Sequence, residues 1–301
     1  MTRSMMSRAG AVLVVTLCGV VGMGLAGTAV ADGGQGAKFA FIRDANVWTM
    51  GLDGQNATRL TTSGDCSAPA WSPDGAKLVY VRGEDTDKQT LWIYDLATKS
   101  AAQFTSTVTG YLCPQWSPDG TRIACFRGAG RTMEMTERSH SQLLTIAIQT
   151  KQVVVLSADV TGACSLAWAP DSAYMAYAFG PPGKASLWII ETGDGKVSAK
   201  DVCTVKDECP EVSIPSIAWR TRDLITFSEW IGGVEEGTAA LRQVTAKGTI
   251  ALLRKGKAEH PWLVTAASND ALWVSEGTVL SSLRGGQMTK VAEDVAEASC
   301  Q

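Results

Sequence analysis

One seven-residue motif recurs along the chain and constrains the fold more than any other feature. It reads PAWSPDG at 69–75, PQWSPDG at 114–120 and, in a weaker copy, LAWAPDS at 166–172. The Pro-Asp-Gly part is typical of a tight turn, because proline presets φ, aspartate bonds its own backbone and glycine accepts a positive φ. An alternating apolar run, which is typical of a strand, follows each copy. These runs are KLVYVR at 77–82, RIACFR at 122–127 and YMAYAF at 174–179.

Each unit continues beyond the alternating run with a further strand, a polar turn and a short last strand. The third strands are LWIYDL at 91–96, LLTIAI at 143–148 and LWIIET at 187–192. Four antiparallel strands in about 45 residues are typical of one blade of a β-propeller. The strand-opening tryptophans lie 43 to 52 residues apart and are Trp71, Trp116, Trp168, Trp219 and Trp262.

The ends of the chain predict how the ring closes. Residues 38–61 match strands two to four of a unit whose first strand is missing, and residues 295–301 fall where a further first strand would begin. The units around 216–230 and 260–275 keep the tryptophan but lose Pro-Asp-Gly. We therefore predict an all-β, six-bladed β-propeller of four-stranded antiparallel blades. Its C-terminal segment completes the N-terminal blade and closes the ring, so that no sheet edge is left open.

The N-terminal segment 1–31 predicts a secretory signal peptide. It carries two arginines and no acid, followed by a long apolar run that ends in Ala-Val-Ala at Ala31. An uncleaved anchor is an alternative, since the run is close to the ~20 residues that span a bilayer. A lipoprotein signal at Cys18 is another, although the bulky Leu17 disfavours it. We expect residues 32–301 to form one exported propeller domain, periplasmic or extracellular.

The balance of acidic and basic residues argues against two classes of partner. Without the leader's two arginines, 25 basic residues face 30 acidic ones. This balance provides neither a basic patch for nucleic acid nor a polybasic tail for anionic lipid. No later apolar run is long enough to span a membrane. We expect a monomer with a protein partner, no nucleic acid, no membrane span after processing, and no cofactor.

The repeated turns carry a family resemblance. A W-S-P-D-G turn followed by an alternating strand and a strand such as LWIY resembles the repeat of TolB-type six-bladed propellers, also called PD40 or WD40-like repeats. The resemblance covers nearly the whole chain after the leader and is strongest at 71–75, 116–120 and 168–171. The resemblance implies the propeller domain and no other domain. Six residues separate Ala31 from the first strand, so we expect the α/β domain of TolB to be absent, and no role in the Tol–Pal system follows.

Six repeat residues are predicted to be structural, through packing of the tryptophans and turn chemistry of the aspartates. Calcium binding by the aspartates is an alternative, but one carboxylate per tight turn is a poor cage for an ion that takes 6–8 oxygens. The six residues are Trp71, Asp74, Trp116, Asp119, Trp168 and Asp171.

The two faces of such a ring differ in loop length. Connections at the Ser-Pro-Asp-Gly end are short, whereas the opposite end carries long connections, including 127–142 and 228–240. Binding residues often lie on loops held by a rigid scaffold. We predict that this face docks a protein, the alternative being that the loops are solvated insertions. The candidate contact residues are Arg131, Glu134, Glu137, Arg138, Trp230, Glu235 and Glu236.

Seven cysteines follow the leader, and most precede a blade tryptophan or lie in a link between blades. In an exported chain this set predicts disulfides. A thiolate metal site is an alternative, but no C-x-x-C pattern supports it. Cys125 lies inside a strand and is expected to be buried and free. The predicted pairs are Cys203 with Cys209, Cys66 with Cys300, and Cys113 with Cys164.

Catalytic signals are few. The chain has two histidines, His140 and His260, and contains no Gly-x-Ser-x-Gly elbow and no phosphate-binding glycine loop. An enzyme needs paired carboxylates or an activated base, and no pair is recognisable among the acids predicted near the channel mouth. We therefore predict an interaction or scaffold module without catalysis. The alternative is a small-molecule or sugar site at the mouth, in a sensor or a hydrolase- or lyase-like enzyme. The acids predicted near the channel mouth are Asp65, Asp207, Glu208 and Glu211.

Overall fold

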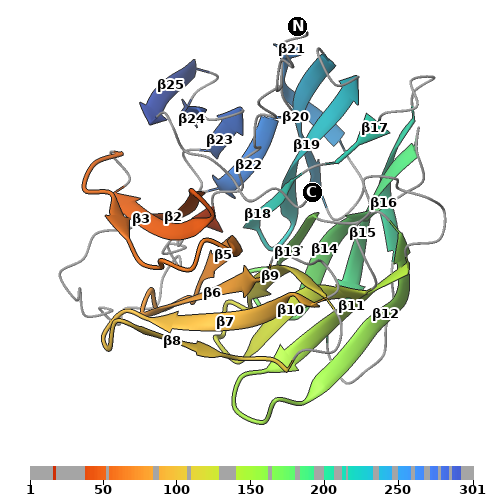
Figure 1. Cartoon of the computed structure of the whole chain (residues 1–301). Coiled ribbons are helices and arrows are strands. Elements are labelled where there is room, and N and C mark those ends of the chain that lie inside the picture. Colours follow the sequence, from red (N-terminus) through yellow and green to blue (C-terminus); the bar gives the residue numbers. More distant parts are fainter. Residues whose placement is uncertain are drawn as a thin grey trace, which may run out of the picture.

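A computed structural model gives the fold of the chain (Figure 1). Because it is built almost entirely of strands and the short turns between them, its elements are described sheet by sheet. The residues that the structure describes are 16–17, 38–51, 54–83, 88–106, 110–128, 140–161, 165–179, 184–192, 200–206, 212–214, 216–232, 237–245, 250–258, 262–267, 272–276, 279–284 and 287–292.

The described strands form six antiparallel sheets that follow one another along the chain and lie around a ring (Figure 1). The first sheet contains β1 (Thr16–Leu17), β2 (Lys38–Arg43), β3 (Asn46–Gly51) and β4 (Thr58–Arg59). The second contains β5 (Cys66–Trp71), β6 (Lys77–Arg82), β7 (Thr90–Asp95) and β8 (Ser100–Gln103). The third contains β9 (Tyr111–Trp116), β10 (Arg122–Gly128), β11 (His140–Ala147) and β12 (Val153–Thr161).

The remaining three sheets repeat this order. The fourth contains β13 (Ser165–Trp168), β14 (Tyr174–Phe179), β15 (Lys184–Glu191) and β16 (Lys200–Lys206). The fifth contains β17 (Val212–Ser213), β18 (Ile217–Thr221), β19 (Leu224–Gly232), β20 (Gly237–Thr245) and β21 (Ile250–Ala258), and both β17 and β18 pair with β19. The sixth contains β22 (Trp262–Ala267), β23 (Leu272–Glu276), β24 (Val279–Arg284) and β25 (Gln287–Ala292). The predicted all-β propeller class is confirmed.

The Ser-Pro-Asp-Gly turns are held by their own side chains. Ser72 Oγ donates to Asp74 Oδ1 at 2.5 Å, and the backbone N of Lys77 donates to Ser72 Oγ at 2.8 Å. The next copy has the same contacts, with Ser117 Oγ donating to Asp119 Oδ1 at 2.6 Å. Gly75 adopts a φ of 68°, in the left-handed region that favours glycine. Each turn is therefore stabilised by hydrogen bonds between its own serine and aspartate.

The core lies between neighbouring sheets. Residues of the second and third sheets form one buried cluster, and residues of the third and fourth form another. The repeat tryptophans belong to these contacts: Trp168 is 7% exposed, and its Nε1 donates to the carbonyl of Gln115 at 3.2 Å. Trp219 Nε1 donates in the same way to the carbonyl of Ala167 at 3.0 Å. The repeated tryptophan therefore joins each of these sheets to the one before it.

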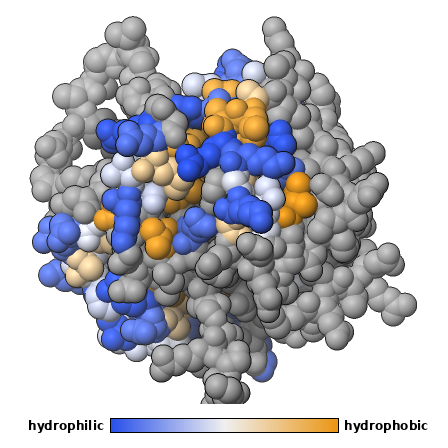
Figure 2. All heavy atoms as spheres, turned by 90° about the horizontal axis from the view of Figure 1, so that it is seen from above, coloured by the Kyte–Doolittle hydropathy of each residue, from blue (hydrophilic) through white to orange (hydrophobic). Residues whose placement is uncertain are grey.

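The outer strands limit edge-to-edge pairing. β4 and β8 are short, and the pairing of β12, β16, β21 and β25 with the neighbouring strand is interrupted by bulges. On the face seen in Figure 2, hydrophobic residues form small areas separated by hydrophilic ones. The exposed large hydrophobic residues of the described chain lie on β12 and β21 and are Val153, Val155, Leu252 and Leu253.

The inner strand of the first sheet differs from the expectation. Segment 295–301, predicted to pair there, lies outside the described residues. In the full-length chain the position is occupied by β1, whose Thr16 and Leu17 pair with Ala40 and Phe39. β1 belongs to segment 1–31, which we expect to be removed, so closure by 295–301 stays a prediction for the processed chain.

Candidate functional site

Arg82 occupies the end of the second sheet opposite the Ser-Pro-Asp-Gly turn. It is the last residue of β6 and pairs with Cys66 on one side and Thr90 on the other. Asp65 directly precedes β5 and therefore lies beside Arg82 at the same end of the sheet. This is the end that carries the longer connections.

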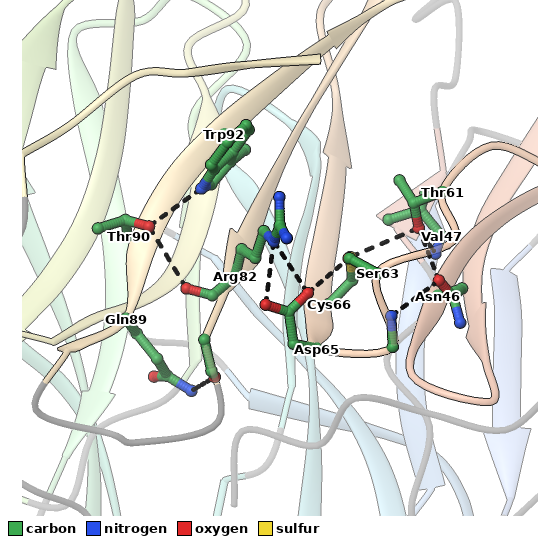
Figure 3. A network of polar contacts seen from close by, with 12 residues as sticks. Asn46, Val47, Thr61, Ser63, Asp65, Cys66, Arg82, Gln89, Thr90 and Trp92 are labelled. Atoms are coloured by element: carbon green, nitrogen blue, oxygen red, sulfur yellow. Dashed lines mark hydrogen bonds and ion pairs between the residues drawn. The ribbon is translucent and has the colours of Figure 1, made fainter. Parts of the chain in front are cut away.

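The guanidinium of Arg82 is held by a carboxylate and an indole ring (Figure 3). Its Nε donates to Oδ1 and Oδ2 of Asp65, both at 3.0 Å, and its Cζ lies 4.7 Å from the centroid of the Trp92 ring. The ring is fixed in turn, because Trp92 Nε1 donates to Thr90 Oγ1 at 3.1 Å. The hydrogen bond to Asp65 raises the pKa of Arg82, so the cation is kept. This network places the guanidinium in one orientation.

The terminal amino groups of Arg82 remain available. Within the described part of the chain, only its Nε takes part in the hydrogen bonds to Asp65, and neither Nη has a partner. The side chain is 35% exposed, so part of it is open to solvent. Two parallel N–H donors match the geometry of a carboxylate or of adjacent carbonyl oxygens.

The first sheet repeats this arrangement. Arg43 ends β2 as Arg82 ends β6, and Trp48 holds the register position on β3 that Trp92 holds on β7. Arg43 Cζ lies 5.2 Å from the centroid of the Trp48 ring, and Trp48 Nε1 donates to the carbonyl of Arg43 at 3.2 Å. Two adjacent sheets thus present an arginine over a tryptophan at the same end. We call the set Arg43, Trp48, Arg82 and Trp92 the arginine–tryptophan ledge.

The third sheet shows that the ledge is not a general property of the repeat. Arg127 occupies the position of Arg82, but Leu144 stands where the second sheet has Trp92. The donors of Arg127 are used within the sheet, because its Nη2 donates to Gln142 Oε1 at 2.7 Å. Among the described sheets, an arginine at this end stacked on a tryptophan of the same sheet is found in the first two.

The link between these two sheets is tied down by hydrogen bonds (Figure 3). The backbone N of Val47 donates to Thr61 Oγ1 at 2.9 Å, and Thr61 Oγ1 donates to Asn46 Oδ1 at 3.3 Å. Asn46 Oδ1 also accepts from the backbone N of Gly64 at 3.1 Å. Asn46 is 2% exposed, so this bonding is internal. The link that carries Asp65 is therefore fixed to the first sheet.

The state of Cys66 contradicts one of the predicted disulfides. The residue is a free, buried thiol, so the predicted bond between Cys66 and Cys300 is wrong for this structure. The thiol lies 3.2 Å from Ser63 Oγ, 3.4 Å from Thr61 Oγ1 and 3.9 Å from Asp65 Oδ1, and these oxygens supply its polar contacts. The sequence placed the residue at the correct end of the blade but could not give the direction of its side chain.

The other cysteines are only partly described. Cys125 is free and fully buried as predicted, and burial raises the pKa of its thiol. Cys113 is disulfide-bonded. Its predicted partner Cys164 lies outside the described residues, so that pairing stays a prediction. The proposed bond between Cys203 and Cys209 also stays a prediction, because those side chains lie outside the described part.

The position of Trp230 contradicts the prediction that it is an exposed contact residue. The residue was expected to be exposed in a loop, but β19 continues to Gly232 and β20 begins at Gly237, so Trp230 lies inside a hairpin. The side chain is 9% exposed and packs in a buried cluster with Leu241 and Leu272. A Cβ atom added to Gly237 would lie 2.5 Å from its ring, which shows how closely the indole is covered. Trp230 is therefore a core residue.

The remaining candidates fall largely outside the described residues. These are Arg131, Glu134, Glu137, Arg138, Glu235 and Glu236, together with Asp207, Glu208, Glu211, His260 and the side chain of His140. Across the ranges that are described, no group of His, Cys, Asp and Glu is arranged to hold a metal ion. The same ranges contain no helix that could cross a lipid bilayer.

Sequence reasoning missed the ledge, although the signal was present. Aligning 38–43 with 77–82 places Arg43 with Arg82, and the following strands begin Asn-Val-Trp and Thr-Leu-Trp. Arginine at the end of one strand and tryptophan third on the next is the pattern. These positions lie at strand ends, outside the long connections where binding residues were expected.

Comparisons with known proteins give the same fold. TolB from Acinetobacter baumannii superposes with a TM-score of 0.63 at 16% identity, covering 86% of this chain and 64% of that chain, so this chain spans less than two thirds of that TolB. An oligogalacturonate lyase in complex with manganese gives 0.62 at 16% identity, with 85% and 73% covered. A nidogen/laminin complex gives 0.58 at 8% identity, with 84% and 91% covered. At these identities the likeness shows the fold alone.

The sequence itself matches one family. No curated protein matches the chain. The family described as the TolB beta propeller domain, PD40, matches residues 36–250, which is more than half of the chain. The repeated turns, the six sheets and this match agree. The chain belongs to the TolB beta-propeller (PD40) family.

Proposed function

We propose that this protein is an exported interaction module that docks a protein partner on the arginine–tryptophan ledge. The observation that carries the proposal is Arg82, whose guanidinium is fixed by Asp65 and Trp92 while its Nη groups have no partner among the described residues. Arginine and tryptophan are enriched among the residues that dominate binding energy at protein interfaces. The partner that fits is a protein segment offering a carboxylate or backbone carbonyls to the Nη groups.

Preorganisation supports this assignment. Ordering a long side chain on binding costs roughly 0.5–1.5 kcal/mol. Arg82 is already held by two hydrogen bonds and a ring contact, so most of this ordering precedes binding. The link that carries Asp65 is itself bonded to Asn46. Arg82 therefore presents its Nη donors without a large rearrangement.

A second candidate function is recognition of an acidic sugar at the same place. Two N–H donors beside an aromatic ring also fit a sugar carboxylate, with the ring against the sugar face. One protein of similar fold is an oligogalacturonate lyase, although the likeness extends only to the fold. Galacturonate oligomers are the matching probe. Binding with micromolar affinity that is lost in Arg82→Lys would favour this function over protein docking.

The test is crosslinking of the secreted chain at native abundance, followed by mass spectrometry. Arg82→Lys and Trp92→Leu are compared with the wild type and with Arg222→Lys. Arg222 is a matched control because its Nε pairs with Asp171 at 3.1 Å at the opposite, turn end of the ring. The expected result is one partner captured by the wild type and Arg222→Lys and lost from both ledge variants. Capture that survives both ledge substitutions contradicts the proposal.

A further inference from the structure

The outer strand of the fifth sheet carries two exposed leucines. Leu252 is 52% exposed and Leu253 is 37% exposed, and they are half of the exposed large hydrophobic residues in the described chain. Both lie on β21, which pairs with β20 on one side and with no described strand on the other. Apolar residues that are exposed side by side often mark a contact surface. The neighbours of these leucines show which kind of surface fits them.

The register of β20 and β21 places cations on the same face as Leu252. A bulge in this pair puts Leu252 opposite Arg242 and puts Lys255 opposite Ala240, which lies two residues along β20 from Arg242. Residues that lie directly opposite, or two apart along one strand, share a face of the sheet. Lys257 is two residues further along the same face, and both lysines are exposed. One face therefore combines an apolar side chain with three cations.

Arg242 is held in place by a buried carboxylate. Its Nε donates to Oε2 of Glu229, whose side chain is only 4% exposed. A buried charge is costly unless it is paired, so Glu229 keeps the guanidinium at this position. Neither Nη of Arg242 has a hydrogen-bond partner within the described ranges, and the side chain is 29% exposed. Its parallel N–H donors fit two oxygens of one phosphate group.

The charge of this region differs from that of the whole chain. β20 and β21 together carry two arginines and two lysines and contain no acid. The chain after the leader is acidic overall, with 25 basic residues against 30 acidic ones. The composition therefore conceals a local excess of positive charge, which the pairing of two strands brings together.

We propose that this face of the fifth sheet binds an anionic lipid surface. Arg242, Lys255 and Lys257 contact the phosphate groups, and Leu252 and Leu253 enter the boundary between headgroups and acyl chains. Attraction to anionic lipid and burial of apolar area both contribute to binding of this kind. The inference goes beyond the docking function. The fifth sheet lies across the ring from the second, so a protein held on the arginine–tryptophan ledge leaves this face open (Figure 1).

Three other occupants fit these observations less well. A partner strand requires a regular edge, but the bulge interrupts β21 at the leucines, and lysines on an edge strand disfavour strand addition. A second copy using the same edge would bring its own lysines against Lys255 and Lys257. A soluble phosphate compound would use the cations and leave Leu252 exposed. A lipid surface uses both kinds of side chain and requires no regular edge.

Co-sedimentation of the secreted chain with vesicles tests the proposal. The vesicles contain equal parts of phosphatidylcholine and phosphatidylglycerol, or phosphatidylcholine alone. Three variants are compared with the wild type. The first combines Leu252→Ser with Leu253→Ser, and the second combines Lys255→Gln with Lys257→Gln. The third, Arg242→Lys, keeps a cation beside the buried carboxylate but loses the planar fork.

Two control variants remove the same kinds of side chain elsewhere. Val153→Ser with Val155→Ser removes the other two exposed large hydrophobic residues, which lie on β12 of the third sheet. Lys99→Gln with Lys151→Gln removes two exposed lysines from turns of the second and third sheets. Every sample has the same N-terminus, so differences between samples do not come from segment 1–31. An unchanged near-ultraviolet circular dichroism spectrum shows that each variant is folded.

The wild type and both controls are expected to bind the anionic vesicles and not phosphatidylcholine alone. The double lysine variant binds about thirtyfold more weakly, since each cation near an anionic surface contributes about fivefold. The double leucine variant binds about tenfold more weakly because less apolar area is buried. Arg242→Lys binds about threefold more weakly. Added salt weakens binding of the wild type, because it screens the attraction.

Several results would overturn the proposal. They include no binding of the wild type to the anionic vesicles, equal binding by the lysine or leucine variant, and equal binding to phosphatidylcholine alone. Vesicle binding that glycerol phosphate abolishes and the leucine variant retains would assign the cations to a soluble phosphate compound. Absence of vesicle binding together with crosslinks from Lys255 or Lys257 to a secreted protein would assign the face to a protein segment.

Discussion

The two ends of the second sheet carry the same kinds of side chain in different states of hydrogen bonding. At the turn end, Asp74 accepts from Ser72 and from the backbone N of Ala76, and Lys77 pairs with Asp95. At the loop end, the carboxylate of Asp65 accepts from the Nε of Arg82 and from the thiol of Cys66. The groups at the turn end are bonded within the sheet, whereas the two Nη groups of Arg82 at the loop end have no partner among the described residues.

This difference separates residues that build the repeat from residues that serve a site. The turn contacts recur in the third sheet at Ser117 and Asp119. The loop-end contacts do not recur there, since Arg127 bonds Gln142 and Leu144 stands at the register position of Trp92. Repetition therefore indicates scaffold, and departure from the repeat indicates function. Substitutions at each end of the sheet and between the sheets test this difference.

The largest effect is expected between the sheets. Trp168→Ala removes a buried ring that bonds Gln115 and lies 5.0 Å from the Arg122 guanidinium carbon. Substitutions of this kind lower the free energy of unfolding by about 3–5 kcal/mol. Urea denaturation measures the loss, and Trp168→Phe serves as a milder control. A loss below about 1 kcal/mol would show that the repeat tryptophan is not the main inter-sheet contact.

A smaller effect, on binding rather than folding, is expected at the loop end. Arg82→Lys keeps the charge but loses the planar fork and its stacking on Trp92. We expect partner affinity to fall about tenfold, equivalent to ~1.4 kcal/mol, with little change in melting temperature. Surface plasmon resonance with the captured partner measures the affinity. Unaltered affinity would move the docking site away from the ledge.

The fold was largely predictable because its signal is repeated. Trp71, Trp116 and Trp168 open the same turn, so each copy supports the interpretation of the others. The site was less predictable because it departs from the repeat. Trp230 lies in a stretch predicted to be a loop, but it belongs to a hairpin whose strands extend past the usual length. Cys66 marks the correct end of a blade, yet its pairing depends on side-chain direction, which one sequence does not encode.

For the turn that contains Asp119 we expect a modest, pH-dependent effect on stability. Burial opposes ionisation of Asp119, but hydrogen bonds from Ser117 and Thr121 outweigh it and lower the pKa. A carboxyl whose pKa is lowered on folding stabilises the protein above its unfolded pKa, ~3.9, and loses this contribution as pH falls through the folded pKa. We expect Asp119→Ala to lower stability by about 1 kcal/mol at pH 7 and by less once the pH has fallen through the lowered pKa of Asp119. Thermal unfolding across pH 2–7 measures this loss of stability. An equal loss at every pH would contradict a contribution from the ionised carboxylate.

The smallest effect is expected from the exposed ion pair at the turn end. The hydrogen bond from Lys77 lowers the pKa of Asp95 to about 2. Lys77→Met is expected to return this pKa toward the ordinary aspartate value of ~3.9, without a measurable change in melting temperature, because surface ion pairs contribute little to stability. NMR titration of the Asp95 carboxyl measures the pKa. A clear loss of stability would mean that the turn end depends on charge as well as on the hydrogen bonds of Ser72 and Asp74, and the contrast with the loop end would weaken.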